Sequence, residues 1–198
     1  MRNFVIVVDM QRDFVAADGA LPVPGAEEIV APMRDWLAGL RPEDTAGVLF
    51  TFDTHVPAVY AASEEAKQFP PHCVKGTSGW ELVVDPGAVD PAIPVLRLEK
   101  GVFDMWAEAG LAVARIGTGG AADRDGFFAG LLDAGIEEVT VVGVAADYCV
   151  RWAVEGLIAL GFRVTVPAGL TRGISRPIGQ VAAEEWPGAA VAIEEMAS

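Results

Sequence analysis

The sequence predicts an α/β protein with a three-layer α/β/α open sheet, mostly parallel and of about six strands. The first observation is a set of short, unbroken apolar runs, which are typical of strands buried on both faces of a parallel sheet. These runs are residues 4–8, 48–52, 95–98, 139–144, 164–166 and 189–193. The second observation is that helical patterns separate several of the runs, as right-handed crossovers between parallel strands require.

Three segments between the runs carry apolar residues at helical spacing. The first is residues 26–40, although Pro32 falls in its early turns, where a proline can remove a backbone hydrogen bond. The second, residues 123–134, begins with aspartate, a favourable N-cap, and is followed by glycine. The third, residues 148–160, is also followed by glycine. We therefore expect three helices at these places.

One further segment, residues 57–93, has several prolines and glycines and no long periodic stretch. We expect an elaborated loop region there, with a short helix near residues 61–67. No repeat or low-complexity tract divides the chain, so we expect one domain over residues 1–198. A chain of this length can bury ~70% of its unfolded surface in a single core.

Composition and charge argue against several classes of protein. Lys and Arg total 14 against 28 Asp and Glu, a formal charge of −14, so we expect no nucleic-acid partner. No apolar run approaches the ~20 residues that span a bilayer, so we expect no membrane association. Two cysteines cannot build a disulfide framework, and the N-terminus lacks signal-peptide features. We expect a reducing cytoplasm.

Chemically reactive side chains follow the predicted strands directly. Asp9 follows the first run, Asp53 and His55 the second, Lys100 the third, and the segment 143–149 the fourth. Open α/β sheets bind their ligands beyond the carboxyl ends of the strands. The sequence therefore predicts a functional site at this edge, with an acid, metal-type ligands, a cation and a thiol together.

The cysteine of this group, Cys149, is a candidate nucleophile. It lies at the expected first turn of a helix, where backbone N–H groups and the helix dipole stabilise a thiolate. Asp9 and Lys100 can supply the acid/base partner and the cation that activate it. Taken singly, Cys149 is more often a small buried hydrophobe, Asp9 a turn cap and Lys100 a surface lysine. Their joint placement favours catalysis.

Both histidines of the chain fall in a second group, a candidate metal site. Asp53 and His55 share one side of an extended segment, since residues i and i+2 point the same way, and His72 follows after a loop. Two imidazoles and one carboxylate leave coordination positions open, as catalytic metal sites do. A single histidine is more often a core or surface residue without a ligand. Glu64 or Glu65 can add a carboxylate, and the spacing does not choose between them.

Aromatic residues lie near the predicted edge in the sequence and are candidates for an apolar ring pocket. They are Phe14, Phe69, Phe103 and Trp106. The remaining tryptophans are predicted to be packing residues: Trp36, Trp80, Trp152 and Trp186.

These residues carry a family resemblance over roughly residues 3–173. The opening Asp9-Met10-Gln11-Arg12-Asp13-Phe14, the pair Lys100-Gly101 and the block 143–150 resemble the motifs of the isochorismatase-like cysteine hydrolases. Asp53-x-His55, the segment 72–77 and the segment 21–27, which begins at Leu21, resemble the nicotinamidase (pyrazinamidase) branch. Three positions depart from that branch. Thr54 stands where tryptophan is usual, Ala146 where threonine is common, and an aspartate near Arg172 is missing.

The resemblance implies an amidohydrolase that converts nicotinamide, or a similar small carboxamide, to the acid plus ammonia through a cysteine thioester. It implies that Asp9 is the base, that Lys100 stabilises the charged pair and that Cys149 attacks the carbonyl. It also implies a cis peptide at Val144-Ala145 and an oxyanion site around Val144, Ala145 and Ala146, with backbone N–H groups near Ala146 and Cys149 as the donors. The substrate pocket is then expected to include Phe14, Leu21, Phe69 and Phe103.

The resemblance further implies a divalent metal at Asp53, His55 and His72, zinc in the first place, with manganese or iron as alternatives. It implies a homodimer or homotetramer. Competing interpretations are a cysteine hydrolase of another amide, ureido or carbamoyl compound, a vinyl-ether hydrolase of the isochorismatase type, and a non-catalytic binding protein on the same fold.

Overall fold

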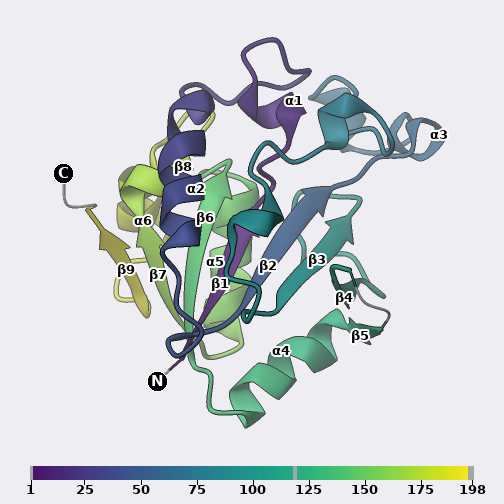
Figure 1. The fold of residues 1–198 in the computed structure, drawn as a ribbon. Coiled ribbons are helices and arrows are strands. Elements are labelled where there is room, and N and C mark those ends of the chain that lie inside the picture. The colour runs from purple at the N-terminus through teal and green to yellow at the C-terminus, as the bar shows by residue number, and fades with distance from the viewer. Residues whose placement is uncertain (1, 118–119, 196–198) are drawn as a thin grey trace.

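The computed structural model describes residues 2–117 and 120–195, and within them the strands form one mixed sheet (Figure 1). The strand order is β5-β4-β3-β2-β1-β6-β7-β9, and β8 pairs with β6 beside this path. The strands are β1 (Asn3–Val8), β2 (Thr45–Asp53), β3 (Val95–Lys100), β4 (Ala112–Arg115), β5 (Ala121–Asp123), β6 (Glu138–Val144), β7 (Arg163–Pro167), β8 (Thr171–Arg172) and β9 (Val191–Glu194).

The predicted open, mostly parallel sheet is confirmed, but the predicted strand number of about six is wrong. Each of the six apolar runs overlaps a strand, and the described residues form nine strands. The three that the pattern missed are β4, β5 and β8. All three are short, and β5 is exposed along its whole length, so none shows an unbroken buried run. The β3–β4 and β4–β5 pairs are antiparallel, and the other pairs are parallel.

The core centres on β1, which pairs with β2 on one side and β6 on the other. Val5, Ile6 and Val7 are fully buried there. A strand covered on both faces has no polar face, which is why its sequence reads as a solid apolar run.

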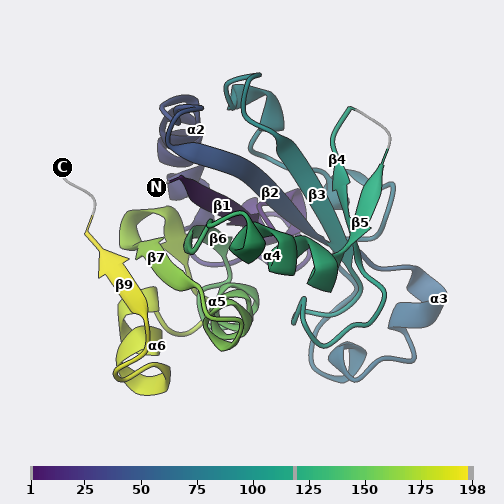
Figure 2. The ribbon, with the colours of Figure 1, turned by 90° about the horizontal axis from the view of Figure 1, so that it is seen from below.

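Helices cover both faces of the sheet. Figure 2 shows α2 on one face, with α4 and α5 on the other. The helices are α1 (Arg12–Val15), α2 (Val30–Ala38), α3 (Pro57–Tyr60), α4 (Arg124–Asp133), α5 (Cys149–Ala159) and α6 (Ile178–Glu185). None of the helices in the described part of the chain is long and apolar enough to cross a membrane.

The three predicted helices are present, and the first of them has an altered start. The first begins as a 3-10 turn at Ala26–Ile29, and Pro32 falls in the first turn of α2, where its missing N–H disturbs little. The Asp123 carboxylate accepts the N–H of Gly126 and so caps α4 as expected. Helix α6 was not predicted. The segment 57–93 contains α3 and short 3-10 turns, one of them at Glu65–Lys67.

The carboxyl ends of β1, β2, β3 and β6 lie together at the end of the sheet that is uppermost in Figure 1. The two central strands approach each other closely there. A Cβ on Gly143 would lie 2.1 Å from the Val8 carbonyl oxygen, and Gly143 has a φ of +116°. Only glycine fits both conditions, and this close approach brings the turn after β6 next to Asp9.

Candidate active site

The structure brings the three predicted catalytic residues together in one buried group. Lys100 Nζ lies 2.8 Å from Asp9 Oδ2 and 3.7 Å from Cys149 Sγ. The exposed fractions are 0% for Asp9, 2% for Lys100 and 4% for Cys149. An acid, a cation and a thiol thus meet in a place that water reaches poorly, where their electrostatic interactions are strong.

Asp9 is held in an unusual backbone conformation. Its φ is +49°, in the left-handed region that residues with side chains rarely adopt. The Thr51 hydroxyl fixes it from β2: it donates to Asp9 Oδ1 at 2.6 Å and accepts the Asp9 N–H at 3.2 Å. Such strain persists where the surroundings over-determine it, and it is frequent at functional sites.

Lys100 is the cation shared by the surrounding acids. Burial lowers the pKa of Lys100, but the carboxylates of Asp53 and Asp9 outweigh burial and hold that pKa well above its usual value. Its ammonium is also 3.6 Å from Asp53 Oδ1. Lys100 is therefore a permanent positive charge between the Cys149 thiol and Asp53 of the candidate metal site.

The predicted position of Cys149, at the first turn of a helix, is confirmed. Cys149 is the first residue of α5, but burial raises the pKa of its thiol well above the usual value, and the lowering effect of Lys100 does not offset this. The helix start and Lys100 favour the thiolate, and burial favours the thiol. A nucleophile of this kind needs a base beside it, and Asp9 is the carboxylate in place.

The turn after β6 contains the expected cis peptide, between Val144 and Ala145. One part of the predicted oxyanion site needs correction. The Ala146 N–H donates to the Arg172 carbonyl at 2.8 Å, so it is already in use. Within the described residues, the N–H groups of Ala145 and Cys149 donate no hydrogen bond to the protein. The Asp147 N–H donates none either, so the available donors are those of Ala145, Asp147 and Cys149 rather than that of Ala146.

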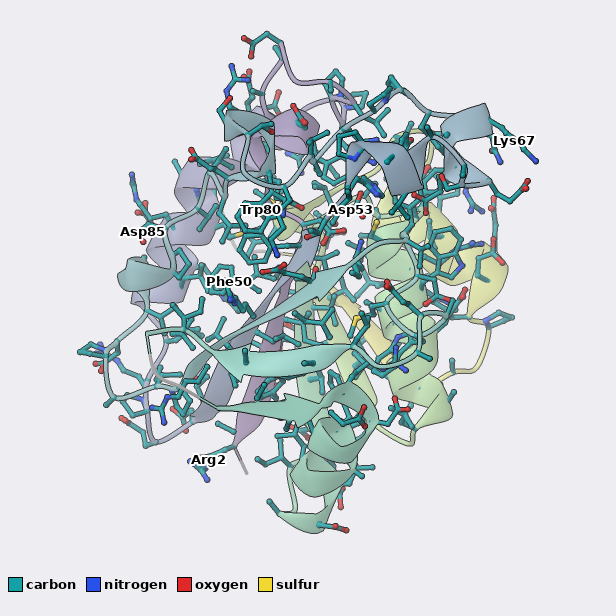
Figure 3. The ribbon with its side chains drawn as sticks, turned by 90° about the vertical axis from the view of Figure 1, so that its right-hand side faces the viewer. Arg2, Phe50, Asp53, Lys67, Trp80 and Asp85 are labelled. Carbon is teal, nitrogen blue, oxygen red and sulfur yellow. The ribbon has the colours of Figure 1, made fainter. Side chains whose placement is uncertain are left out.

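The predicted metal ligands also lie together. Asp53 Oδ2 is 3.0 Å from His55 Nε2 and 2.9 Å from His72 Nε2, and all three residues are buried. Their ligand atoms lie within 4.8 Å of one another. Figure 3 shows Asp53 beneath the loops at this end of the sheet, far from Arg2 at the other end.

The protonation of His72 indicates that a cation fits this group. Its Nδ1 lies 2.7 Å from the Pro70 carbonyl, which can only accept, so Nδ1 carries the proton. In a neutral imidazole, Nε2 then presents a lone pair to an Asp53 oxygen 2.9 Å away. That contact is repulsive unless a proton or a metal ion lies between the two atoms. A backbone carbonyl that fixes the other ring nitrogen is also the usual support of a metal-bound histidine.

The pKa shifts follow the same arrangement. Burial lowers the pKa of His72, but the hydrogen bond to Asp53, the charges of Asp53 and Glu65 and the contact with the Pro70 carbonyl together outweigh burial, and the net shift is upward. Burial raises the pKa of Asp53, but Lys100 and the two histidines outweigh it and hold that pKa far below its usual value. Asp53 is therefore an ionised carboxylate, as a metal ligand must be.

Of the two glutamates left open by the sequence, only Glu65 reaches this group. Its Oε2 is buried without a hydrogen bond, 3.8 Å from His55 Nε2, while Oε1 accepts the Phe103 N–H at 2.8 Å. Burial raises the pKa of Glu65. Glu64 points to solvent and pairs with Lys67 at 2.6 Å.

Three of the predicted pocket residues contact this group or one another. The His72 ring centroid is 5.2 Å from that of Phe14 and 5.6 Å from that of Phe103, and Phe69 packs edge-on against Phe103 at 5.3 Å. Leu21 is half-buried in the loop after α1, where its N–H donates to the Asp13 carbonyl, and it stays a predicted pocket residue.

Comparison with known proteins identifies the family. The model of the isochorismatase domain matches residues 3–183, most of the chain. The chain belongs to the isochorismatase family. The resemblance seen in the motifs is therefore confirmed.

The relatives within the isochorismatase family include nicotinamidases. The nicotinamidase/pyrazinamidase of Mycobacterium tuberculosis is 32% identical over 192 residues, which cover 94% of this chain and 95% of the relative. The nicotinamidase of Saccharomyces cerevisiae is 31% identical over 196 residues, covering 86% and 88%. The pyrazinamidase of Pyrococcus horikoshii, solved in complex with zinc, has a TM-score of 0.73 and 26% identity, covering 99% of this chain and 100% of that one.

The structure adds site residues that the motifs of the isochorismatase family did not single out by role. Gln11 is fully buried, and its amide brackets the metal-ligand segment: it accepts the Asp53 N–H and donates to the Asp53 carbonyl, both at 2.8 Å. Tyr148 and Trp152 join the aromatic group around Phe103. The only sequence signal for Gln11 was its place just after a predicted strand. Its partners are backbone groups of Asp53, and only the fold brings these close to it.

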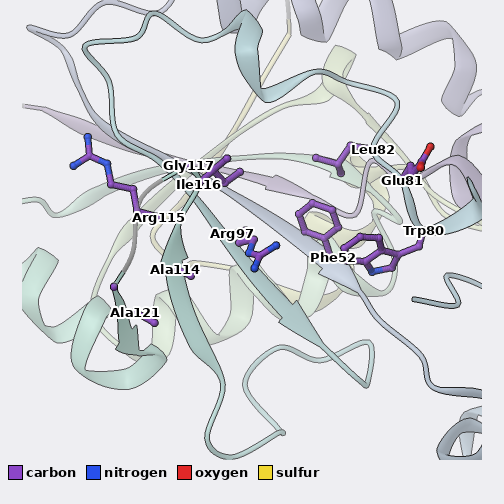
Figure 4. A pocket seen from close by; sticks show the side chains of 11 residues that line it. Phe52, Trp80, Glu81, Leu82, Arg97, Ala114, Arg115, Ile116, Gly117 and Ala121 are labelled. Carbon is purple, nitrogen blue, oxygen red and sulfur yellow. The ribbon is translucent and has the colours of Figure 1, made fainter. Parts of the chain in front are cut away.

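Thr54 follows β2 directly and is in contact with Trp80. The Trp80 indole N–H donates to Thr54 Oγ1 at 2.9 Å, so the Thr54 hydroxyl is directed to Trp80. Figure 4 shows Phe52, Trp80 and Arg97 around a separate cavity of about 800 Å³. The lining includes none of Asp9, Lys100 and Cys149. Thr54 itself lines another pocket together with His55 and Lys100, so this departure from the nicotinamidase pattern lies beside the predicted site residues.

Proposed function

We propose that this protein, as a single domain over residues 1–198, is an amidohydrolase that converts nicotinamide or a similar small carboxamide to the acid plus ammonia. The observation that carries the proposal is the contact of the buried trio Asp9, Lys100 and Cys149 with Asp53 of the metal-type group. The identity of about one third to the mycobacterial and yeast nicotinamidases supports the choice of substrate.

The first half of the reaction forms a thioester. Asp9 takes the thiol proton of Cys149, and the sulfur forms a bond to the amide carbonyl carbon while the C=O π electrons move to oxygen. The N–H groups of Ala145 and Cys149 hold this oxyanion, and removal of one such donor typically costs ~3 kcal/mol. Asp9 then gives its proton to the amide nitrogen, the C–N bond breaks, and ammonia leaves.

The second half releases the acid. Water gives a proton to Asp9 and adds to the thioester carbonyl carbon. The same two N–H groups hold the oxyanion that forms. Collapse of this intermediate breaks the C–S bond, and the proton returns to sulfur. Lys100 keeps its charge throughout, so it stabilises the ionised Asp9 at rest and the thiolate when it forms.

We propose that Asp53, His55 and His72 hold a divalent metal, and that Glu65 is its fourth protein ligand. Zinc is the first choice, because imidazoles and carboxylates suit it; with four protein ligands, a substrate atom would have to bind as a fifth ligand, an expansion that catalytic zinc sites allow. The Pyrococcus relative was solved with zinc. A metal bound there supplies a Lewis-acid contact that orients the ring nitrogen of a pyridine carboxamide. Phe14 and Phe103, which flank His72, would lie against the ring.

Ammonia release by the zinc-loaded protein tests this proposal, with nicotinamide, pyrazinamide and an N-carbamoyl amino acid as substrates. We expect turnover of the first two, loss of turnover in Cys149→Ala, and a trapped covalent adduct by mass spectrometry. Full turnover in Cys149→Ala contradicts the thioester. Hydrolysis of the carbamoyl compound alone assigns the site to the competing substrate class.

The expected homodimer or homotetramer and the cytoplasmic location remain predictions. Light scattering after size-exclusion chromatography measures the first of them.

A further inference from the structure

Asp147 is a buried carboxylate that belongs to neither the proposed trio nor the metal group. It lies two residues before Cys149, is 4% exposed, and accepts three backbone N–H groups. Its Oδ1 accepts from Ile174 at 2.8 Å, and its Oδ2 accepts from Ser175 at 2.8 Å and Arg176 at 3.1 Å. One buried carboxylate therefore ties the turn that precedes the nucleophile to the loop that follows β8.

The same loop holds the turn at a second point. The Ala146 N–H donates to the Arg172 carbonyl at 2.8 Å, directly before Asp147. The loop is closely wound around the carboxylate: a Cβ on Gly173 would lie 2.0 Å from the Arg176 carbonyl oxygen and 3.1 Å from Asp147 Oδ1. Two successive residues of the turn are thus fixed from outside it.

The turn presents the N–H groups of Ala145 and Cys149, which, like that of Asp147, donate no hydrogen bond to any described residue. The Ala145 carbonyl accepts from Tyr148 at 3.1 Å and from Val150 at 3.0 Å, which sets the direction of the peptide groups around Ala145. Because Ala146 and Asp147 lie between the N–H groups of Ala145 and Cys149, a change in the backbone torsion angles of this turn moves the two N–H groups relative to each other. Donors of an oxyanion site are effective only when they are held in place before the reaction.

We propose that Asp147 is a positioning residue for the oxyanion-binding N–H groups of Ala145 and Cys149, acting through the loop 172–176. This inference rests on the proposed amide hydrolysis. A carboxylate suits the task because both of its oxygens only accept. An asparagine replaces one oxygen by an NH₂ group, which would face N–H donors and push the loop away.

Asp147→Asn tests the proposal, with Asp123→Asn as the matched control. Asp123 also accepts a backbone N–H, that of Gly126 at 3.1 Å, but it caps α4 and does not touch the site. We expect kcat for nicotinamide to fall about 10- to 100-fold in Asp147→Asn, less than for complete loss of a donor, since the donor is misplaced and not removed. KM should be nearly unchanged, because the donors act on the oxyanion and not on the bound amide. Asp123→Asn should keep the parent kcat. Asp147→Glu, which keeps both acceptors, should recover part of the loss.

Two further measurements separate positioning from general damage. Pyridine-3-carboxaldehyde adds to the Cys149 thiol and forms a thiohemiacetal, whose oxygen needs the same two N–H groups. Alkylation by iodoacetamide needs only the thiol. We expect Asp147→Asn to weaken aldehyde binding by the same factor as kcat, and to leave the alkylation rate and the circular dichroism spectrum unchanged.

An equal fall in alkylation and in aldehyde binding would overturn the proposal, because it would mean that the whole site is disturbed. A kcat for Asp147→Asn equal to that of Asp123→Asn would also overturn it. Failure of the parent protein to hydrolyse any amide of the panel would refute the proposed function instead. In that case the aldehyde and alkylation comparison still decides whether Asp147 positions the two N–H groups.

Discussion

The Lys100 ammonium lies 3.6 Å from Asp53 Oδ1, and it is the same ammonium that pairs with Asp9. The catalytic trio and the metal-type group therefore share one buried cation. Removal of Lys100 leaves two carboxylates, of Asp9 and Asp53, without their common counter-ion in a region of low dielectric. A change of charge in either group thus alters the electrostatic stabilisation of the other, because both interact with the Lys100 ammonium.

Replacement of Lys100 by methionine should strongly destabilise the protein. Breaking a buried ion pair by removal of one partner typically costs ~3–5 kcal/mol, because the remaining charge is uncompensated. Lys75→Met is the control, since Lys75 pairs with Glu99 at the surface and should cost at most ~1 kcal/mol. Urea unfolding of the metal-free proteins measures both values. Equal losses in the two variants would contradict the shared-cation interpretation.

Glu65→Gln should weaken zinc binding by at least about tenfold, because a buried carboxylate 3.8 Å from His55 Nε2 loses its charge. Glu64→Gln, one residue away and exposed, should leave the affinity unchanged. Competition with a chromophoric chelator gives both dissociation constants. If the two variants bind zinc alike, Glu65 is not a ligand.

Zinc should raise the melting temperature of the metal-free protein. A ligand present at 100 times its Kd stabilises the folded state by ~2.7 kcal/mol when it does not bind the unfolded chain. The stabilisation should disappear in His72→Ala, whose Nε2 is one of the clustered ligand atoms. Calorimetry with and without zinc makes the comparison, and a shift that survives in His72→Ala would place the metal elsewhere.

Thr51→Val should lower kcat and leave the thiol in place. It removes the hydroxyl that bonds both the N–H and Oδ1 of Asp9, so the left-handed conformation of Asp9 loses its support. We expect a loss of ~1–3 kcal/mol in stability, with kcat at least tenfold lower. Thr140→Val, another buried threonine on the sheet, should lose stability alone. A kcat effect of the same size in Thr140→Val would show that packing, not Asp9, is responsible.

Much of the fold follows from patterns that each segment carries alone. The solid apolar runs of β1, β2 and β6 are buried on both faces because helices cover the sheet, and Asp9, Asp53 and Lys100 follow from strand ends meeting at one edge. Short or exposed strands such as β5 leave no such pattern.

The parts of the site that the sequence did not yield depend on depth and on backbone partners. The raised pKa of the Cys149 thiol results from burial by the whole fold, which the local start of a helix does not reveal. Gln11 and Asp147 act on main-chain groups distant in sequence, and any polar side chain of that size looks the same before folding. The engagement of the Ala146 N–H depends on β8, a two-residue strand.

Successive residues of a strand point to opposite sides, and in β2 this separates two compartments. Phe52 lines the cavity of Figure 4, whereas Asp53, the next residue, faces Lys100 and the histidines. Strand β2 thus separates the site residues on one side from the cavity lined by Phe52 on the other. Substitutions among the residues that line this cavity can therefore change its shape while the reacting atoms keep their positions.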